Sequence, residues 1–420
     1  MALVVMCPAL ASAQGGEWPT LSGAGIEYLS RSGSFQVSLS GQLDLETMLV
    51  AEDRWAGLVG GTSADTASSD WRTACAECHI ADNIRPRGKG GHVSAHRLRV
   101  FADVFLGDHV YSLVEVRSDR GSAPTNGRTQ VRVEQAFLRL VTGGGRLGAQ
   151  AGRFASPFGA YPLRHLTVVD PFLRPPLPYD YRTVMNWSHA PPDATELLAW
   201  KQWPMFFRFP GVPPVWNVPY QWGGMLFGRL GPVDLRVAAV NSAPSSEPIA
   251  WGFDWERLEH PSWVVGARVK PSASLELGAS YNRGPWMEEI RVGTIEPLPG
   301  APPGSLPPTY WDFDQEIVSV DFTYARGPVM ARGEAMLDLW EVPNVADRPQ
   351  ERLYTVELQT DLTAGLFASA RFGFVDFRPL DLGTGDPPED WDDDVHRLEA
   401  SLGYRLVRNG GVLVSAYRQG

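Results

Sequence analysis

Apolar and polar residues alternate with a period of two along much of the chain. Apolar side chains occupy nearly every second position in the stretches 35–45, 98–106, 318–324, 354–358 and 398–406, and the positions between them are mostly polar, charged or small. Successive side chains of a β-strand point to opposite faces, so this pattern predicts strands with one apolar and one polar face.

The predicted strands and the links between them favour a membrane barrel over a soluble sandwich. The candidate strands are 34–50, 94–106, 109–118, 130–141, 145–154, 221–229, 232–240, 262–270, 273–283, 313–325, 328–340, 351–362, 365–377, 395–407 and 411–420. Most have the length of about ten residues that a tilted strand needs to cross a bilayer, whereas sandwich strands are usually nearer five or six. Short links such as 107–108 alternate strictly with long ones such as 51–93 and 155–220, as in outer-membrane barrels.

The strand count predicts where the first long link lies. If 34–50 rises from the periplasm, the link 51–93 is extracellular. Single-chain bacterial barrels have an even number of strands, and fifteen candidates are found. We therefore expect an all-β, antiparallel transmembrane barrel of 16 strands, and we expect its closing strand after Gly420 to be missing from this chain.

Composition narrows the class of protein further. After the first dozen residues no apolar stretch is long enough to span a bilayer as a helix, which excludes a helical membrane protein. The formal net charge is −11 and basic runs are absent, so nothing indicates nucleic-acid binding. Residues 1–13 end in Ala11-Ser-Ala13 and resemble the remnant of a secretory signal peptide. The barrel then occupies 14–420, and Cys7 falls in the removed part. A lipoprotein interpretation of Cys7 is the weaker one.

The segment Cys75-Ala-Glu-Cys78-His79 matches the attachment motif of c-type haem. Two thiols at this spacing reach the two vinyl groups as thioethers, and the adjacent His79 is thereby placed as the proximal iron ligand. Attachment takes place outside the cytoplasm, which agrees with an exported chain. The motif predicts one haem c in a haem-binding loop, 51–93, inserted between the first two predicted strands.

Two other interpretations of the cysteines stay open. Cys75 and Cys78 could form a local disulfide in an oxidising compartment, or they could bind zinc together with His79 and His92. They are the only cysteines beyond residue 13, and their spacing with the adjacent histidine favours haem.

The residues after the motif supply further candidates. Arg85, Arg87 and Lys89 could neutralise haem propionates, although a solvated basic loop explains them as well. His92 is the first candidate for the distal iron ligand, because glycines before it allow the loop to fold back. His96 is the second candidate, because it lies two residues from Leu98 and is therefore expected on the same lipid-facing side of the strand. Methionine or water are the remaining options.

The link 155–220 is rich in proline and aromatic residues. It could fold inward as a constriction, pack against the haem-binding loop, or cap the barrel from outside.

The corner Gly152-Arg-Phe-Ala-Ser-Pro-Phe-Gly159 resembles the phosphate-selective porin O and P family. In that family a strand pair ending in a Glu-x-x-x-Leu pattern leads into such a corner, and Glu134-Gln-Ala-Phe-Leu138 precedes it here. Ser40-Gly-Gln-Leu-Asp44 looks like the family's opening strand. The resemblance implies a 16-stranded barrel in the bilayer of the bacterial outer membrane, and it allows for a homotrimer. It does not imply anion selectivity, because the family's lysine clusters have no match.

A barrel that carries one c-type haem also resembles the fused cytochrome–porins of iron-oxidising bacteria. In those proteins the haem segment precedes the barrel, whereas here it follows the first predicted strand. The resemblance implies electron transfer at the cell surface, with iron(II) oxidation as an analogy. The partners would be an extracellular electron donor or acceptor and a periplasmic cytochrome or other electron carrier, because one haem cannot bridge a core of about 30 Å.

Two alternative functions remain. The first is a passive porin for anions or small solutes, with 51–93 as an ordinary loop. The second is a haem-based binder or peroxidase-like enzyme, which would need an open distal position on the iron. No nucleophile, acid–base dyad or phosphate loop indicates a hydrolase or kinase.

Overall fold

The structure is a computed structural model of the chain. It describes residues 26–30, 34–49, 92–119, 130–142, 145–166, 170–202, 211–297, 307–382, 387–407 and 410–420. The strands are β1 Ile26–Leu29, β2 Phe35–Leu49, β3 His92–Leu106, β4 Val110–Asp119, β5 Gln130–Val141, β6 Leu147–Ala155, β7 Tyr220–Leu230, β8 Val233–Val240, β9 Ser262–Ser272, β10 Leu275–Pro285, β11 Asp314–Arg326, β12 Val329–Trp340, β13 Gln350–Thr363, β14 Leu366–Phe377, β15 Pro379–Leu380, β16 Glu389–Asp390, β17 Val395–Val407 and β18 Gly410–Gln419.

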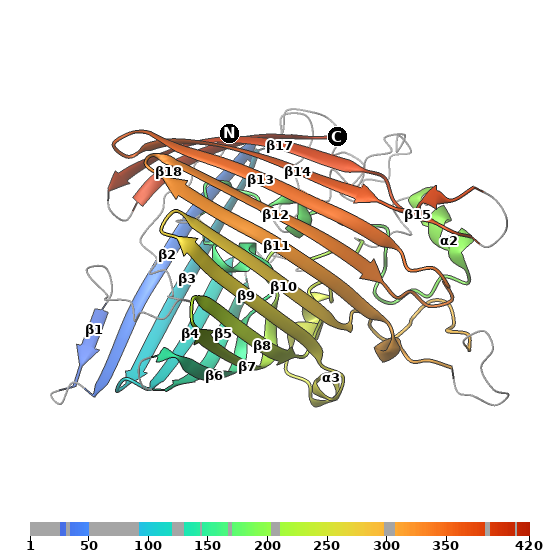
Figure 1. Ribbon diagram of the computed structural model, residues 1–420, viewed down its shortest axis with the longest axis horizontal. Helices are drawn as coiled ribbons and strands as arrows, with labels where there is room; N and C mark the ends of the chain where they lie inside the picture. Colours follow the sequence, from blue (N-terminus) through green and yellow to red (C-terminus); the bar gives the residue numbers. More distant parts are fainter. Residues whose placement is uncertain are drawn as a thin grey trace.

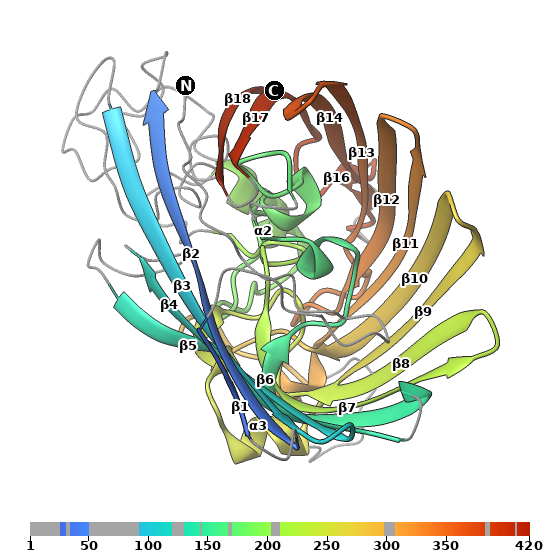
Figure 2. The ribbon, with the colours of Figure 1, turned by 90° about the vertical axis from the view of Figure 1, so that its left-hand side faces the viewer.

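Sixteen strands form one antiparallel sheet in which each strand pairs with its neighbours along the chain. Only β15 and β16 stand apart, as a separate two-stranded hairpin. The long strands lie side by side and tilted (Figure 1). The sheet curls into a barrel-like wall around the segment that contains helix α2, Ala194–Ala199 (Figure 2). The predicted all-β, antiparallel architecture is confirmed.

All fifteen strands predicted from the sequence are present, but the sixteenth is not where we expected it. It is β1, which precedes β2 and pairs with it from Ile26↔Leu39 to Leu29↔Gln36. The described sheet therefore counts sixteen strands with β1 as the member before 34–50, and the expectation of a closing strand after Gly420 stays a prediction. A four-residue strand is too short to show a periodicity, which is why the sequence pattern missed it.

The sheet has its apolar face outside and its charged face inside, which is the reverse of the arrangement in a soluble protein. Outward side chains such as Leu98, Val356 and Leu398 are apolar and 41%, 55% and 59% exposed. The alternate positions on the same strands carry charge and are buried, as Arg99 and Glu399 show. Because apolar atoms face outward along whole strands, the surroundings of this wall must be apolar, as for a transmembrane β-barrel.

The remaining elements lie in the links. They are the helix α3 Trp255–Glu259 and the 3₁₀ helices η3 Tyr161–Leu163, η4 Leu177–Tyr179, η5 Trp200–Gln202, η6 Pro248–Trp251 and η7 Tyr310–Asp312. Among the described residues, no helix is both long and apolar enough to cross a membrane.

Candidate functional site: the lumen and its inward loop

The link between β6 and β7 enters the barrel at the predicted glycine corner, and we call its described residues, 156–166, 170–202 and 211–219, the inner loop. Gly152 has a φ of +129°, and a Cβ there would lie 2.3 Å from the carbonyl oxygen of Ala136. Gly159 has a φ of +74° and a hypothetical Cβ that would collide with Tyr179 Oη. Only glycine fits such conformations without strain. The two glycines therefore turn the chain from the wall into the lumen, where Phe158 is fully buried.

The first anchor of the inner loop is Glu334 on β12. Its Oε1 accepts hydrogen bonds from the Ala160 amide at 2.9 Å and from Ser319 Oγ at 2.8 Å. Tyr179 Oη donates to the same carboxyl group at 2.9 Å. Glu334 is buried, and its carboxyl oxygens accept hydrogen bonds from these donors. The inner loop is thus fixed to the wall near its beginning.

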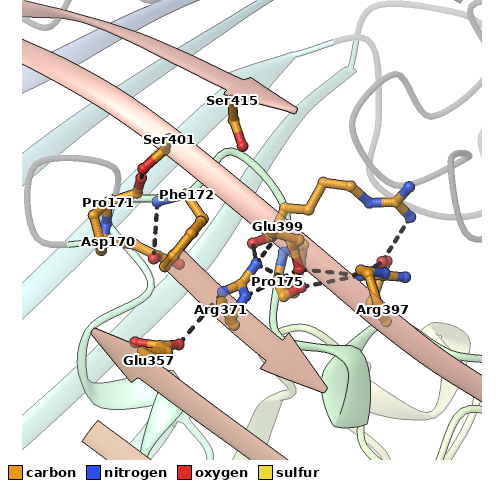
Figure 3. Close-up of polar contacts among 12 residues, drawn as sticks. Asp170, Pro171, Phe172, Pro175, Glu357, Arg371, Arg397, Glu399, Ser401 and Ser415 are labelled. Carbon is orange, nitrogen blue, oxygen red and sulfur yellow. Dashed lines mark hydrogen bonds and ion pairs between the residues drawn. The ribbon is translucent and has the colours of Figure 1, made fainter. Parts of the chain in front are cut away.

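A second anchor lies on β14 and β17 (Figure 3). Arg371 donates to the carbonyl oxygen of Arg174 in the inner loop at 2.6 Å and to Glu399 at 2.7 Å. Ser401 Oγ donates to the carbonyl oxygen of Pro171 at 2.6 Å. Side chains of the wall thus donate hydrogen bonds to loop carbonyl oxygens that would otherwise be buried without a partner. These hydrogen bonds stabilise the loop inside the barrel.

The third anchor is ionic. Arg397 on β17 and Arg174 in the inner loop each lie 2.6 Å from Asp180 Oδ2. Arg397 and Asp180 are fully buried. One arginine of the wall and one arginine of the loop therefore share the carboxylate of Asp180. Of the three placements that the sequence left open for 155–220, the inward fold is confirmed for the described residues of the link, and packing against the haem-binding loop stays a prediction.

A cavity of about 220 Å³ remains between the inner loop and the wall. Its lining includes the apolar residues Ala160, Leu163 and Phe322 and five charged ones, Arg164 from the loop and Arg268, Arg332, Glu334 and Glu357 from the wall. Arg164 lies 2.8 Å from Glu357, and Arg332 lies 3.8 Å from the same carboxylate. The free space beside the loop therefore has both charged and apolar walls, and its charged side chains can interact with water-soluble molecules.

Burial shifts the acid–base behaviour of two inner-loop side chains. Burial raises the pKa of Asp170 to about 6, although Arg371 and Arg164 oppose the shift. Burial lowers the pKa of His165 to about 3, and the positive charge of Arg99 adds to the effect. His165 is therefore neutral at physiological pH, and its Nε2 lies 3.2 Å from Tyr220 Oη.

A bulge on β5 places two consecutive polar residues in the lumen. The register between β4 and β5 shifts between Glu115 and Val116, so that Glu134 and Gln135 both point inward and are buried. Gln135 donates to Glu115 at 2.7 Å, and Glu134 lies 2.9 Å from Arg132. A strict two-residue alternation would have sent one of the pair outward, so the sequence pattern could not reveal this part of the lumen.

Most of the predicted haem residues lie outside the described part of the chain. These are Cys75, Cys78, His79, Arg85, Arg87 and Lys89. His92 begins β3 and pairs in the register with Leu49 of β2. His96 is exposed, as its neighbour on the same face Leu98 is, so its predicted outward parity is confirmed. Among the described residues, no group of three or more His, Cys, Asp or Glu is placed to hold a metal ion.

The lumenal side chains that the structure brings together were not singled out from the sequence. The lumen-facing positions of the predicted strands include Arg371, Arg397 and Glu399. The period-two alternation alone could have indicated that these side chains face the lumen. Their partners Arg174 and Asp180 lie in a link without periodicity. The sequence alone therefore could not show that these residues contact the wall.

Comparison with known proteins gives only distant likenesses. No family model matches the chain, and no curated protein matches it. Among solved structures, OmpT of Vibrio cholerae is 10% identical, with 93% of this chain and 88% of that chain covered and a TM-score of 0.48. The outer membrane channel DcaP of Acinetobacter baumannii is 10% identical over 94% and 100% of the two chains, with a TM-score of 0.47. OmpF of Salmonella typhi, in a complex with daunomycin, is 10% identical over the same shares, with a TM-score of 0.46. The fold assignment rests on the sheet itself.

Proposed function

We propose that this chain is a porin of the bacterial outer membrane, a passive channel for small water-soluble molecules. The observation that carries the proposal is the reversed wall, with apolar side chains outside and buried charged side chains inside. Such a wall is stable in a bilayer only if its strands satisfy one another's backbone groups, as neighbouring strands of this sheet do.

The inner loop sets the size of the proposed passage. It is anchored to β12, β14 and β17 by the contacts of Glu334, Arg371 and Arg397. Because these contacts are buried, the loop narrows the lumen as a fixed element, and the cavity beside it, which charged side chains line in part, is the proposed route for solutes.

Swelling of liposomes tests the channel. Vesicles that contain the purified protein should swell in solutions of small sugars, and the rate should fall steeply as the sugar grows. Vesicles prepared with heat-denatured protein are the control. Equal swelling rates in both preparations would refute the channel.

We propose, as a second function, that the chain carries one covalent haem c and transfers electrons at the cell surface. The supporting observation is the motif Cys75-Ala-Glu-Cys78-His79, which lies in the link between β2 and β3. When bound, the haem would supply a one-electron redox centre, with His79 as its proximal ligand. Iron(II) oxidation and a periplasmic electron carrier belong to this proposal alone.

The haem has a test independent of the channel. Protein exported in a host with a haem-attachment system should give pyridine-haemochrome bands that remain after acid–acetone extraction. The Cys75→Ala/Cys78→Ala double variant should give none. A colourless wild-type protein would refute the haem and leave the channel untouched.

A further inference from the structure

The segment that follows β10 runs along part of the inner loop. It comprises residues 286–297 at the start of the long link between β10 and β11, and we call it the strap. Backbone hydrogen bonds join the two segments, from Glu288 N to Trp187 O at 2.9 Å, from Arg291 N to Ser188 O at 2.8 Å and from Ala190 N to Val292 O at 2.9 Å. Long links lie on the extracellular side of outer-membrane barrels, so the strap crosses the inner loop at the extracellular mouth of the lumen.

The base of the strap is fixed inside the barrel. Trp286 and Met287 are each 1% exposed. Trp286 Nε1 donates to the carbonyl oxygen of Glu341 at 3.0 Å, and its ring contacts that of Trp340 edge-on, with the two ring centroids 4.9 Å apart. The strap therefore turns inward directly after β10, and its base cannot move without exposing buried aromatic side chains.

The tip of the strap, residues 291–297, is exposed by contrast. Every residue of the tip except Ile295 is exposed, and Val292 reaches 52%. A segment with few buried apolar contacts opens locally at a lower free-energy cost than a buried segment does. A buried base and an exposed tip are the arrangement of a hinged element.

One side chain of the next long link holds the tip. Asn344, between β12 and β13, donates from Nδ2 to the carbonyl oxygen of Thr294 in the strap at 2.7 Å and to that of Pro191 in the inner loop at 2.8 Å. Its Oδ1 accepts a hydrogen bond from the amide of Glu296 at 2.8 Å. A single carboxamide thus joins three segments that are far apart in the sequence.

The backbone at this contact is unusual in two places. Among the described residues, Asn344 is the only one other than glycine with a positive φ, at +61°. Gly293 in the tip has a φ of +82°, and a Cβ there would lie 2.1 Å from the carbonyl oxygen of Ala190. Sparsely populated backbone conformations persist where the surrounding contacts require them, and they are frequent at clamps and switch regions. The contact between the tip and the inner loop therefore has the properties of a latch.

We propose that the strap is a lid at the extracellular mouth of the lumen and that Asn344 is the latch that keeps it closed. The lid hinges at Trp286 and Met287, and its tip separates from the inner loop at 187–191. Opening widens the entrance and leaves the anchored part of the inner loop in place. The lid rests on the proposed channel, because it has a function only if solutes enter the lumen.

Hydrogen exchange of the folded, detergent-solubilised protein tests the latch without reference to conduction. Asn344→Gly removes the carboxamide and keeps a residue that adopts a φ of +61° without strain. The amides of Glu288, Arg291 and Ala190 should exchange about tenfold or more faster in this variant, because the hydrogen bonds that hold the tip are lost.

Asn344→Asp separates the loss of hydrogen bonds from the flexibility of glycine. Aspartate also tolerates a positive φ, but an ionised carboxylate has no donor for the carbonyl oxygens of Thr294 and Pro191. It should therefore accelerate exchange at the same amides. Exchange at the wild-type rate in both Asn344 variants would overturn the latch.

Thr309→Ala is the matched control. Thr309 lies in the same link as the strap and its Oγ1 donates to Asp312 at 3.0 Å, within the cap of η7. The variant removes a side-chain hydrogen bond from this link without touching the strap, so exchange in the strap should stay unchanged. Heat-modifiable migration in gels shows that each variant is folded.

Recordings from planar bilayers test whether the strap covers the passage. Both Asn344 variants should show a higher conductance level than wild type, whereas Thr309→Ala should match wild type. Faster exchange with unchanged conductance would overturn the lid, because the strap would then lie beside the passage. Faster exchange in the variants, with neither wild type nor variants conducting, would refute the proposed channel and uphold the latch.

Discussion

Arg397 on β17 lies 2.6 Å from Asp180 in the inner loop, and both side chains are fully buried. The pair joins the barrel wall to a segment more than two hundred residues earlier in the chain. Removing one partner of a buried ion pair leaves the other charged and unpaired, which typically costs several kcal/mol. The inner loop is therefore held by interactions that should be measurable one at a time.

Replacing Arg397 by methionine should loosen the inner loop. We expect the free energy for local opening around 177–183 to fall by about 3 kcal/mol, measured by hydrogen exchange of the backbone amides. Arg405→Met is the control on the same strand, because Arg405 and Asp361 are about half exposed and 3.4 Å apart. That exposed pair should contribute less than about 1 kcal/mol. Equal effects of the two variants would show that the buried pair does not anchor the loop.

The inner loop should be more firmly held in acid than at neutral pH. Burial raises the pKa of Asp170 to about 6 from an ordinary value of 3.8, against the opposing charges of Arg371 and Arg164. Since the folded state binds this proton more tightly than the unfolded state, the contribution to stability is present below about pH 4 and is lost as the pH rises through about 6. Protection of the loop amides should therefore decrease over that window. Asp170→Asn should flatten this dependence, and an unchanged profile in that variant would assign it to another group.

Gly152 should not tolerate a side chain. Its positive φ and the nearby Ala136 carbonyl oxygen leave no space for a Cβ. Gly152→Ala should destabilise the barrel by roughly 2–4 kcal/mol, measured as a lower urea midpoint in micelles. Gly224→Ala provides the comparison, because the nearest atom to a Cβ there is 3.9 Å away. If both variants unfold at the same urea concentration, the corner is not constrained as described.

A charged residue on the outer face should lower the folding stability most when it lies near the middle of a strand. Val356, central in β13, is 55% exposed, and Leu362 near its short-turn end is 54% exposed. An arginine at the membrane midplane costs about 2–4 kcal/mol, whereas one near the interface costs about 0–1 kcal/mol. Val356→Arg should therefore lower folding stability in lipid vesicles far more than Leu362→Arg. Two equal losses would contradict a bilayer around β13.

The sequence pattern was sufficient to predict the long strands, but it could not predict the contacts inside the lumen. Period-two alternation located β2 and β17, because each has one apolar face along its whole length. It missed β1, because four residues are too few to show a period, and it missed the bulge at Glu134 and Gln135, because a bulge breaks the period. The contact of Asp180 with Arg397 joins an irregular link to a distant strand, and such pairing depends on how the chain folds back.

Recording from a planar lipid bilayer tests the central claim most directly. Purified full-length protein added to a bilayer in concentrated KCl should produce discrete conductance steps of uniform size, since the inner loop is anchored and the lumen has a fixed width. Flotation with liposomes shows independently that the protein has inserted. Inserted protein that leaves the bilayer electrically silent would contradict the account of this chain as an outer-membrane channel.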